Sequence, residues 1–315
     1  MILKKVFKEL NVFSQCKKYG LPLWQCPQFL FLAMGIIIIS STLLAYGVGT
    51  RYIDDPLMVA FGILLLTATL IIMAFFIIQS FERLAEASRM KTEFISIVSH
   101  QLRAPLSNLK WAIEFLMSGR LGKIEEKQTE YFRILKENSG RMEELISGLL
   151  TVSRIESATL NLKKEIVSLE KIAESLILEF KPFARASNVG VKFSSQENLP
   201  EIFIDPSRIK LVLENLLDNA IRYSQEKGII EMSLERKEGN LYFEIKDNGV
   251  GIPKEDQKYI FQKFFRSENA LKYQTQGSGL GLYIAKAIVE KSGGKIGFKS
   301  KENKGTTFWL TLPVQ

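Results

Sequence analysis

Two long apolar runs without a single charged residue constrain this chain more than any other feature. The first extends from Phe29 to Val48 and the second from Pro56 to Ile78. Each holds about 20 residues or more, enough for an α-helix to cross the roughly 30 Å hydrocarbon core of a bilayer. The alternative is a pair of buried helices in a soluble core, but such helices rarely run so far without a charge. The sequence therefore predicts two membrane-spanning helices, over about 29–48 and 56–78.

The two predicted spans must form a hairpin, because only the segment GTRYIDD separates them. So short an outer loop cannot fold into a ligand-binding domain. Positively charged residues flank the spans on their other sides, namely Lys4, Lys5, Lys8, Lys17 and Lys18 before them and Arg83, Arg89 and Lys91 after them. Since such flanks stay in the cytoplasm, we expect a multi-pass protein of the cytoplasmic membrane with both termini inside. The first apolar run begins late and a second follows at once, which disfavours a cleaved signal peptide.

Composition excludes several classes of protein. The 315 residues suggest about two domains. Two cysteines, Cys16 and Cys26, and one histidine rule out a disulfide scaffold and show no zinc-binding pattern. The net charge of +8 is not concentrated in a basic stripe, so we expect no nucleic-acid partner.

A helical hairpin is predicted to follow the membrane spans. The chain contains neither Gly nor Pro from Gln79 until Pro105, where we expect a kink. Apolar residues then recur at heptad-like steps at Ile95, Val98, Leu102, Leu109, Ala112 and Leu116. After a glycine-containing turn over 117–127, a second stripe consists of Leu135, Asn138, Met142, Leu145, Leu149 and Val152. Two such helices cannot enclose a core alone, so we expect a homodimer with a four-helix bundle.

The single histidine, His100, lies five residues after Ile95 and two after Val98. At about 100° per residue this places it roughly opposite the apolar seam. One interpretation is a solvated surface histidine without a role. The other is a nucleophile, because an imidazole that is neutral near pH 7 keeps a free lone pair on one ring nitrogen.

From about residue 161 the period changes to that of short alternating strands. The expected strands are 189–195, 228–237, 241–250, 294–300 and 306–314, with helices over about 168–184, 207–224 and 279–292. This succession predicts an α/β sandwich with a mostly antiparallel sheet and one helical layer.

Three polar motifs lie in this half. Asn215, Asn219 and Arg222 share a face of the second helix, and buried amides need partners, which a Mg²⁺–phosphate cluster or neighbouring backbone would supply. Asp247, Gly249 and Gly251 form either a simple turn or a carboxylate site for an adenine amino group. Gly277, Gly279, Leu280 and Gly281 open the third helix, which suits either a tight turn or a phosphate. The stretch 267–279 could close over the site as a lid.

Six segments in order resemble the membrane sensor histidine kinases of two-component signalling. SHQLRAPL resembles the histidine box, ENLLDNAIRY the asparagine box, DNGVGI and GSGLGL the two glycine boxes, IFQKFFR the phenylalanine box and GTTFWLTLP the closing strand. The resemblance extends from about residue 90 to the C-terminus. The apolar runs and their flanks give a basic segment 1–28, the membrane hairpin 29–78 and a signalling helix 79–93. The resemblance implies a dimerisation and histidine phosphotransfer domain over 94–158 and a catalytic ATP-binding domain of the Bergerat type over 161–315.

The resemblance also implies roles. His100 would accept the γ-phosphoryl group of ATP, with Gln101 orienting its ring, and pass it to an Asp of a response regulator receiver domain. Asn219 would hold Mg²⁺ with support from Asn215, and Asp247 would read the adenine. The remaining implied nucleotide-binding residues are Arg222, Tyr223, Gly249, Gly251, Arg266, Gly277, Gly279, Leu280, Gly281 and Thr306.

Departures from the family pattern qualify these roles. The family usually has an acidic residue where this chain has Gln101, and a Thr or Asn where it has Ala104. Because an amide accepts no proton and Ala104 cannot hydrogen-bond, we expect slower autophosphorylation and weak phosphatase activity. An alternative is a non-catalytic signalling scaffold that binds ATP. A further alternative, an ATP-hydrolysing relative, is disfavoured, since those relatives carry a catalytic Glu where this chain has Asn215. Glu214 lies about 100° round the helix from Asn215, so it cannot easily take the place of that catalytic Glu.

Overall fold

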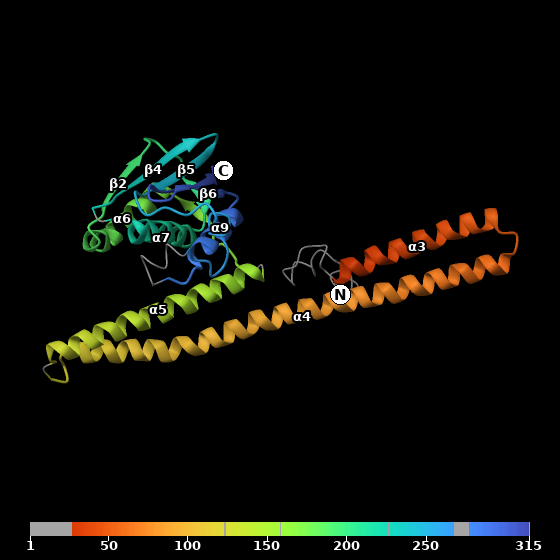
Figure 1. Ribbon diagram of the computed structural model, residues 1–315, viewed down its shortest axis with the longest axis horizontal. Coiled ribbons are helices and arrows are strands. Elements are labelled where there is room, and N and C mark those ends of the chain that lie inside the picture. Colours follow the sequence, from red (N-terminus) through yellow and green to blue (C-terminus); the bar gives the residue numbers. More distant parts are fainter. Residues whose placement is uncertain (1–26, 123, 158, 226, 268–276, 315) are drawn as a thin grey trace, which may run out of the picture. The chain divides into compact units, whose positions relative to one another are not determined.

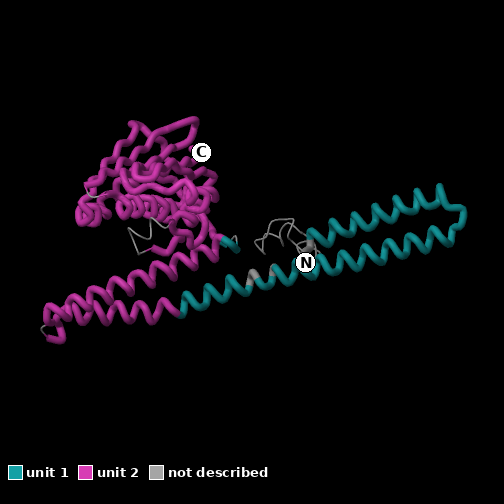
Figure 2. Tube along the Cα trace, viewed as in Figure 1, with its two compact units in different colours: residues 1–101, 156–159 teal, residues 102–155, 160–315 magenta. Residues whose placement is uncertain are grey.

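The computed structural model describes residues 27–122, 124–157, 159–225, 227–267 and 277–314. The chain divides into two compact units, residues 1–101 with 156–159 and residues 102–155 with 160–315 (Figure 2). The N-terminal segment with its two cysteines and most of the expected lid lie outside the described residues.

The first unit contains two long apolar helices. Helix α3 spans Pro27–Tyr52 and helix α4 begins at Pro56 (Figure 1). The connection is shorter than the sequence suggested, because α3 takes in the first four residues of the expected loop. Asp55 caps the second helix by accepting a hydrogen bond from the Leu57 amide at 2.9 Å. Gly49 lets the helices approach closely, since a Cβ there would lie 2.8 Å from a Val59 methyl group.

Both helices pass the length and hydropathy test for a membrane span, over Phe29–Tyr52 and Pro56–Leu84. Of their most apolar windows, 0% and 6% are buried, so this apolar surface does not lie in a protein core. Exposing so much apolar surface to water is unfavourable, whereas the hydrocarbon core of a bilayer would accommodate it.

Helix α4 continues to Met117, so Pro105 does not end it, and the kink predicted there stays a prediction. Helix α5 follows over Glu126–Glu156 after a turn in which Gly119 and Gly122 have positive φ. Within the second unit, Lys110 pairs with Glu143 and Lys136 with Glu114, each at 3.2 Å. The seam residues remain largely open, with Leu102, Leu109, Leu116, Leu135 and Met142 between 38% and 47% exposed.

The second stripe is only partly free for a dimer partner, which corrects the sequence-based expectation. Val152 belongs to the buried core shared with the C-terminal domain, and Leu145 lines a cavity there. Periodicity marked α5 as having an apolar face, but it could not show that two surfaces share that face.

The C-terminal domain is the predicted α/β sandwich. Its five-stranded sheet has the order β2-β4-β5-β7-β6. The strands are β2 (Gly190–Ser195), β4 (Ile229–Lys237), β5 (Asn240–Lys246), β6 (Lys295–Lys301) and β7 (Gly305–Pro313). All neighbours pair antiparallel except β2 and β4, which are parallel. A small second sheet joins β1 (Glu165–Val167) to β3 (Ile202–Ile204), two short strands that were not predicted from the sequence.

One helical layer covers the sheet, formed by α6 (Leu169–Ala186), α7 (Pro206–Tyr223) and α9 (Gly281–Lys291) (Figure 1). Helix α7 begins after Asp205, whose carboxylate accepts from the Arg208 amide at 3.0 Å, and Pro206 stands in the first turn. Alternate residues of the strands face these helices; on β5 they are Leu241, Phe243 and Ile245, each 1% exposed. The core therefore lies between the sheet and the helices, and it fixes the loops that build the site.

Candidate nucleotide site

A cavity of about 870 Å³ lies in the second unit, where α7, the start of α9 and the loops after β5 meet one face of α5. It collects most of the residues singled out in the sequence: Asn215, Asn219, Arg222, Tyr223, Asp247, Gly251, Arg266, Gly277, Gly279, Leu280, Gly281 and Thr306. These residues come from segments up to about ninety positions apart. The fold therefore brings three separate polar motifs to one site.

Asp247 supplies a buried carboxylate at the end of β5. Its Oδ1 accepts hydrogen bonds from the amides of Gly249 at 2.8 Å and Thr306 at 3.1 Å. No described residue donates a hydrogen bond to Oδ2, and Asp247 lines the cavity. Burial raises the pKa of Asp247 to about 6, although the two backbone hydrogen bonds oppose that shift. The cavity thus presents one uncommitted carboxylate oxygen, which suits a donor such as an exocyclic amino group.

Glycines hold this turn against the protein's own backbone. A Cβ on Gly249 would lie 2.1 Å from the Tyr223 carbonyl oxygen, and one on Gly251 would lie 2.2 Å from that of Lys301. Gly251 also has a φ of +65°. Gly249 does not line the cavity, so its role in the described structure is to let the turn pack closely.

The polar residues of α7 that line the cavity differ in whether their side chains are already hydrogen-bonded. The side chain of Asn219 is half-buried and makes no hydrogen bond to a described residue. By contrast, Asn215 donates to the Leu211 carbonyl at 2.7 Å. Arg222 pairs with Asp218 at 2.7 Å and lies over the Phe183 ring. Asn219 therefore has the amide most available for a ligand.

The glycine-rich segment opens α9 as expected. Leu280 is the N-cap and the helix begins at Gly281. Gly277 and Gly279 have φ values of +138° and +67°, and a Cβ on Gly279 would lie 2.7 Å from the backbone of Phe264. A Cβ on Gly281 would lie 2.3 Å from the Asn215 side-chain oxygen. The start of α9 thus packs against α7 and directs free backbone amides to the cavity, a favourable site for anions.

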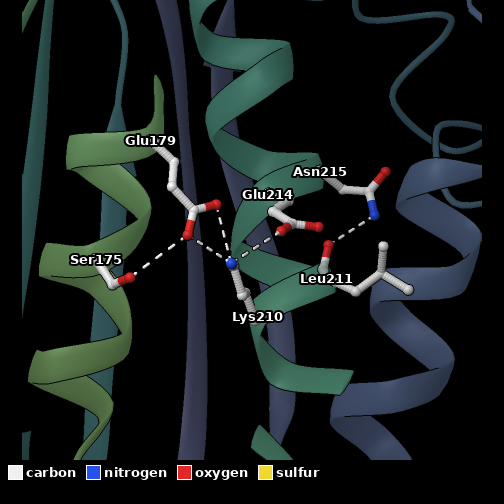
Figure 3. Close-up of polar contacts among 6 residues, drawn as sticks. All are labelled: Ser175, Glu179, Lys210, Leu211, Glu214 and Asn215. Carbon is white, nitrogen blue, oxygen red and sulfur yellow. Dashed lines mark hydrogen bonds and ion pairs between the residues drawn. The ribbon is translucent and has the colours of Figure 1, made fainter. Parts of the chain in front are cut away.

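Glu214 also lines the cavity, but it takes part in an ion-pair network away from Asn215. Lys210 contacts Glu179 at 2.7 Å and Glu214 at 3.9 Å (Figure 3). Burial raises the pKa of Glu214, and the charge of Lys210 opposes this. Because Glu214 lies beside Lys210, it is poorly placed to act in place of the Glu of ATP-hydrolysing relatives.

Two features of the site were missed from the sequence. The face of α5 forms a wall of the cavity, with Arg141 and Gly148 among its residues, and Glu179 of α6 holds Lys210. Neither segment carries a motif, since ordinary helical positions acquire these roles only through contacts distant in sequence.

His100, Gln101 and Ala104 are all exposed on α4. The placement of His100 off the apolar face of its helix stays a prediction, since the seam residue Leu102 is also exposed, at 45%. Because His100 is exposed, its ring is available to a second protein or domain.

The sheet, its single helical layer and the cavity at the start of α9 form an α/β sandwich with a site suited to an anionic ligand. Two family models match the chain. The first, "Histidine kinase-, DNA gyrase B-, and HSP90-like ATPase", matches residues 204–315, and the second, "His Kinase A (phospho-acceptor) domain", matches residues 90–158.

Curated relatives agree with these models. The sensor histidine kinase WalK of Bacillus subtilis is 34% identical over 71% of this chain and 37% of its own length. The sensor protein SrrB of Staphylococcus aureus is 33% identical over 71% and 38%. The circadian input-output histidine kinase CikA of Synechococcus elongatus is 31% identical over 73% and 31%. The chain thus spans about a third of the length of the curated relatives it matches.

Among solved structures, full-length ShkA in complex with AMPPNP matches with a TM-score of 0.59 and 25% identity, over 70% of this chain and 45% of that one. With both domain models in the expected order and sensor kinases among its relatives, the chain belongs to the sensor histidine kinases of two-component signalling.

Proposed function

We propose that this protein is a dimeric membrane histidine kinase that phosphorylates itself on His100 from ATP and passes the phosphoryl group to an Asp of a response regulator. The observation that carries the proposal is the cavity, which gathers Asp247, Asn219 and the start of α9 in one ATP-binding domain. An exposed imidazole on α4 supplies the acceptor.

Different residues of the cavity bind different parts of the nucleotide. The free Oδ2 of Asp247 accepts from the adenine amino group, while Thr306 fixes that carboxylate through its amide. The backbone at Gly277–Gly281 faces the phosphates. Tyr223 and Arg266 line the same cavity, and Arg266 also donates to the Gly277 carbonyl at 3.3 Å.

The residues present also fit Mg²⁺, which prefers oxygen ligands and keeps phosphates and water in its shell. Asn219 has an uncommitted amide oxygen at the cavity, and Asn215 supports it from the preceding turn of α7. When bound, Mg²⁺ would neutralise charge on the phosphates. We infer that Asn219 contributes a ligand and Asn215 mainly orients the neighbouring backbone.

His100 acts as the nucleophile. A neutral ring nitrogen attacks the γ-phosphorus of ATP, ADP leaves, and the ring carries the phosphoryl group. Gln101 can orient the ring through its amide but cannot accept the ring proton, so we expect slower transfer than with an acidic residue.

The proposed function implies three partners for this protein. A second copy would cover the exposed seam of α4 and α5, a receiver domain would approach His100, and the bilayer would surround α3 and the first part of α4. The positive flanks of the two spans favour a topology with both termini in the cytoplasm.

Labelling with γ-phosphate-labelled ATP tests the proposal. We expect the full-length protein to acquire an acid-labile, base-stable label that His100→Ala abolishes. An Asp247→Asn variant should lower the labelling by weakening nucleotide binding. Absence of label despite ATP binding would identify a scaffold, and ATP turnover far above the yield of phosphoprotein would identify an ATP-hydrolysing protein.

A further inference from the structure

The α5 wall of the cavity carries a guanidinium that the proposed function does not use. Arg141 lies on the face of α5 that lines the cavity, together with Glu137, Gly140, Glu144, Gly148 and Thr151. These positions repeat at steps of three and four along one helix face. Arg141 is half-buried, and its side chain makes no hydrogen bond or ion pair with a described residue. A guanidinium held at a cavity without a partner is available to an anionic ligand.

The other arginines of the cavity are already engaged. Arg222 is neutralised by Asp218, with its Nε 2.7 Å from both carboxylate oxygens. Arg266 donates to the Gly277 carbonyl oxygen. Since a nucleoside triphosphate carries several negative charges, the uncommitted charge of Arg141 is the one best able to respond to it.

Arg141 lies on the face of α5 that meets the start of α9. The adenine end is marked by Asp247 and the phosphate end by the start of α9. Helix α5 meets the latter, because a Cβ on Gly148 would lie 3.2 Å from a methyl carbon of Leu280. Arg141 lies seven residues before Gly148, two helical turns along the same face.

The α5 wall would repel phosphates without this arginine. Glu137 and Glu144 stand four residues before and three residues after Arg141, and both line the cavity. Loss of the guanidinium would therefore leave two carboxylates facing a polyanion. The wall suits an anionic ligand only while Arg141 is present.

We propose that Arg141 binds the terminal phosphate of ATP, so that the nucleotide links helix α5 to the ATP-binding domain. The inference rests on the proposed binding of ATP in this cavity and adds a residue from the helical hairpin to that site. ADP lacks this γ-phosphate and therefore does not make the link. ATP thus holds the ATP-binding domain against α5, and loss of the γ-phosphoryl group releases it.

Nucleotide affinity tests the inference. Full-length protein in lipid nanodiscs is titrated with a non-hydrolysable ATP analogue and with ADP, each with Mg²⁺. We expect Arg141→Gln to weaken binding of the analogue about tenfold and of ADP less than about twofold, because a charge-assisted hydrogen bond to one phosphate is lost. Arg141→Lys should fall between, since it keeps the charge but not the paired donors. The matched control is Arg133→Gln, an exposed arginine of α5 outside the cavity, which should change neither affinity.

Hydrogen exchange gives a second measurement that a purely structural role would not alter. In the unsubstituted protein, the ATP analogue should slow amide exchange over 137–151 more than ADP does, and Arg141→Gln should remove this difference. Equal losses for both nucleotides, or unchanged affinity for both, would overturn the inference. Failure of the proposed function is separable, because it appears in the unsubstituted protein as absent nucleotide binding or absent His100 labelling.

Discussion

At the scale of single residues, Asp247 shows how burial and hydrogen bonding set the chemistry of the site. Its Oδ1 is held by two backbone amides, so its other oxygen faces the cavity. The pKa near 6 means that the carboxylate is ionised at neutral pH but becomes protonated under mildly acidic conditions. Ionisation is needed to accept from adenine on the free oxygen.

Nucleotide affinity should therefore depend on pH. We expect ATP binding to be steady above about pH 7 and to fall as the pH drops through about 6. The fold should respond in the opposite direction: because burial raises the pKa of Asp247, its ionisation lowers stability as the pH rises from about 4 to about 6. Titration calorimetry from pH 5 to 8 measures the first effect, and thermal melting without nucleotide, compared with Asp247→Asn, measures the second.

The Asp247→Asn variant sharpens this prediction. The two backbone donors retain the amide oxygen, which turns the amide NH₂ group toward the adenine amino group, donor against donor. We expect ATP affinity to fall at least about tenfold and its pH dependence to disappear. Inosine triphosphate, which has an acceptor in place of that amino group, is the control and should not show the acidic loss. Equal behaviour of the two nucleotides would count against Asp247 as the adenine contact.

At the scale of elements, helices α4 and α5 leave apolar side chains partly uncovered. Leu109 is 44% exposed in the second unit, as part of the seam that the heptad spacing predicted. Fully burying an exposed leucine contributes about 1.5–3 kcal/mol, so covering the part of Leu109 that is still exposed contributes less than this, once in each protomer of a symmetric dimer. The heptad spacing in the sequence predicted this seam, and in the structure no described part of the chain covers its exposed leucines.

A charged residue in the seam should weaken the dimer. We expect Leu109→Asp to raise the dissociation constant of the full-length dimer in detergent at least about tenfold, because a carboxylate would be buried without a partner. Sedimentation analysis measures this. Ser107→Asp, exposed on the same helix but off the seam, serves as the control. An unchanged dimer in Leu109→Asp would show that this seam is not the interface.

At the scale of the whole molecule, the output of the kinase depends on the balance between gaining and removing phosphoryl groups. Ala104, four residues after His100, is exposed and has no group to position water. We expect Ala104→Thr to increase dephosphorylation of a phosphorylated receiver domain about fivefold or more, and Gln101→Glu to increase autophosphorylation instead. Time courses with labelled receiver domain separate the two rates. Rapid dephosphorylation by the unsubstituted protein, with no gain in Ala104→Thr, would contradict the prediction.

Local patterns in the chain determined a large part of this protein. The apolar runs predicted α3 and the start of α4, alternation predicted the five strands of the main sheet to within a few residues, and glycines marked the start of α9. These features depend on neighbours within a few residues, so the sequence carries them directly. The motif residues were also recognisable, because their types suit carboxylate, amide and backbone contacts with a nucleotide.

Contacts between distant segments decided the rest. The short strands β1 and β3 are stabilised by pairing with each other. Strand β2 pairs in parallel with β4, although helix α7 separates the two strands along the chain. The placement of Glu214 beside Lys210 and the approach of α5 to Leu280 likewise join residues far apart along the chain. Periodicity reports which face of an element is apolar, but packing alone determines what that face meets. For this reason Arg141 resembled any other exposed helical arginine until the tertiary structure placed it at the cavity.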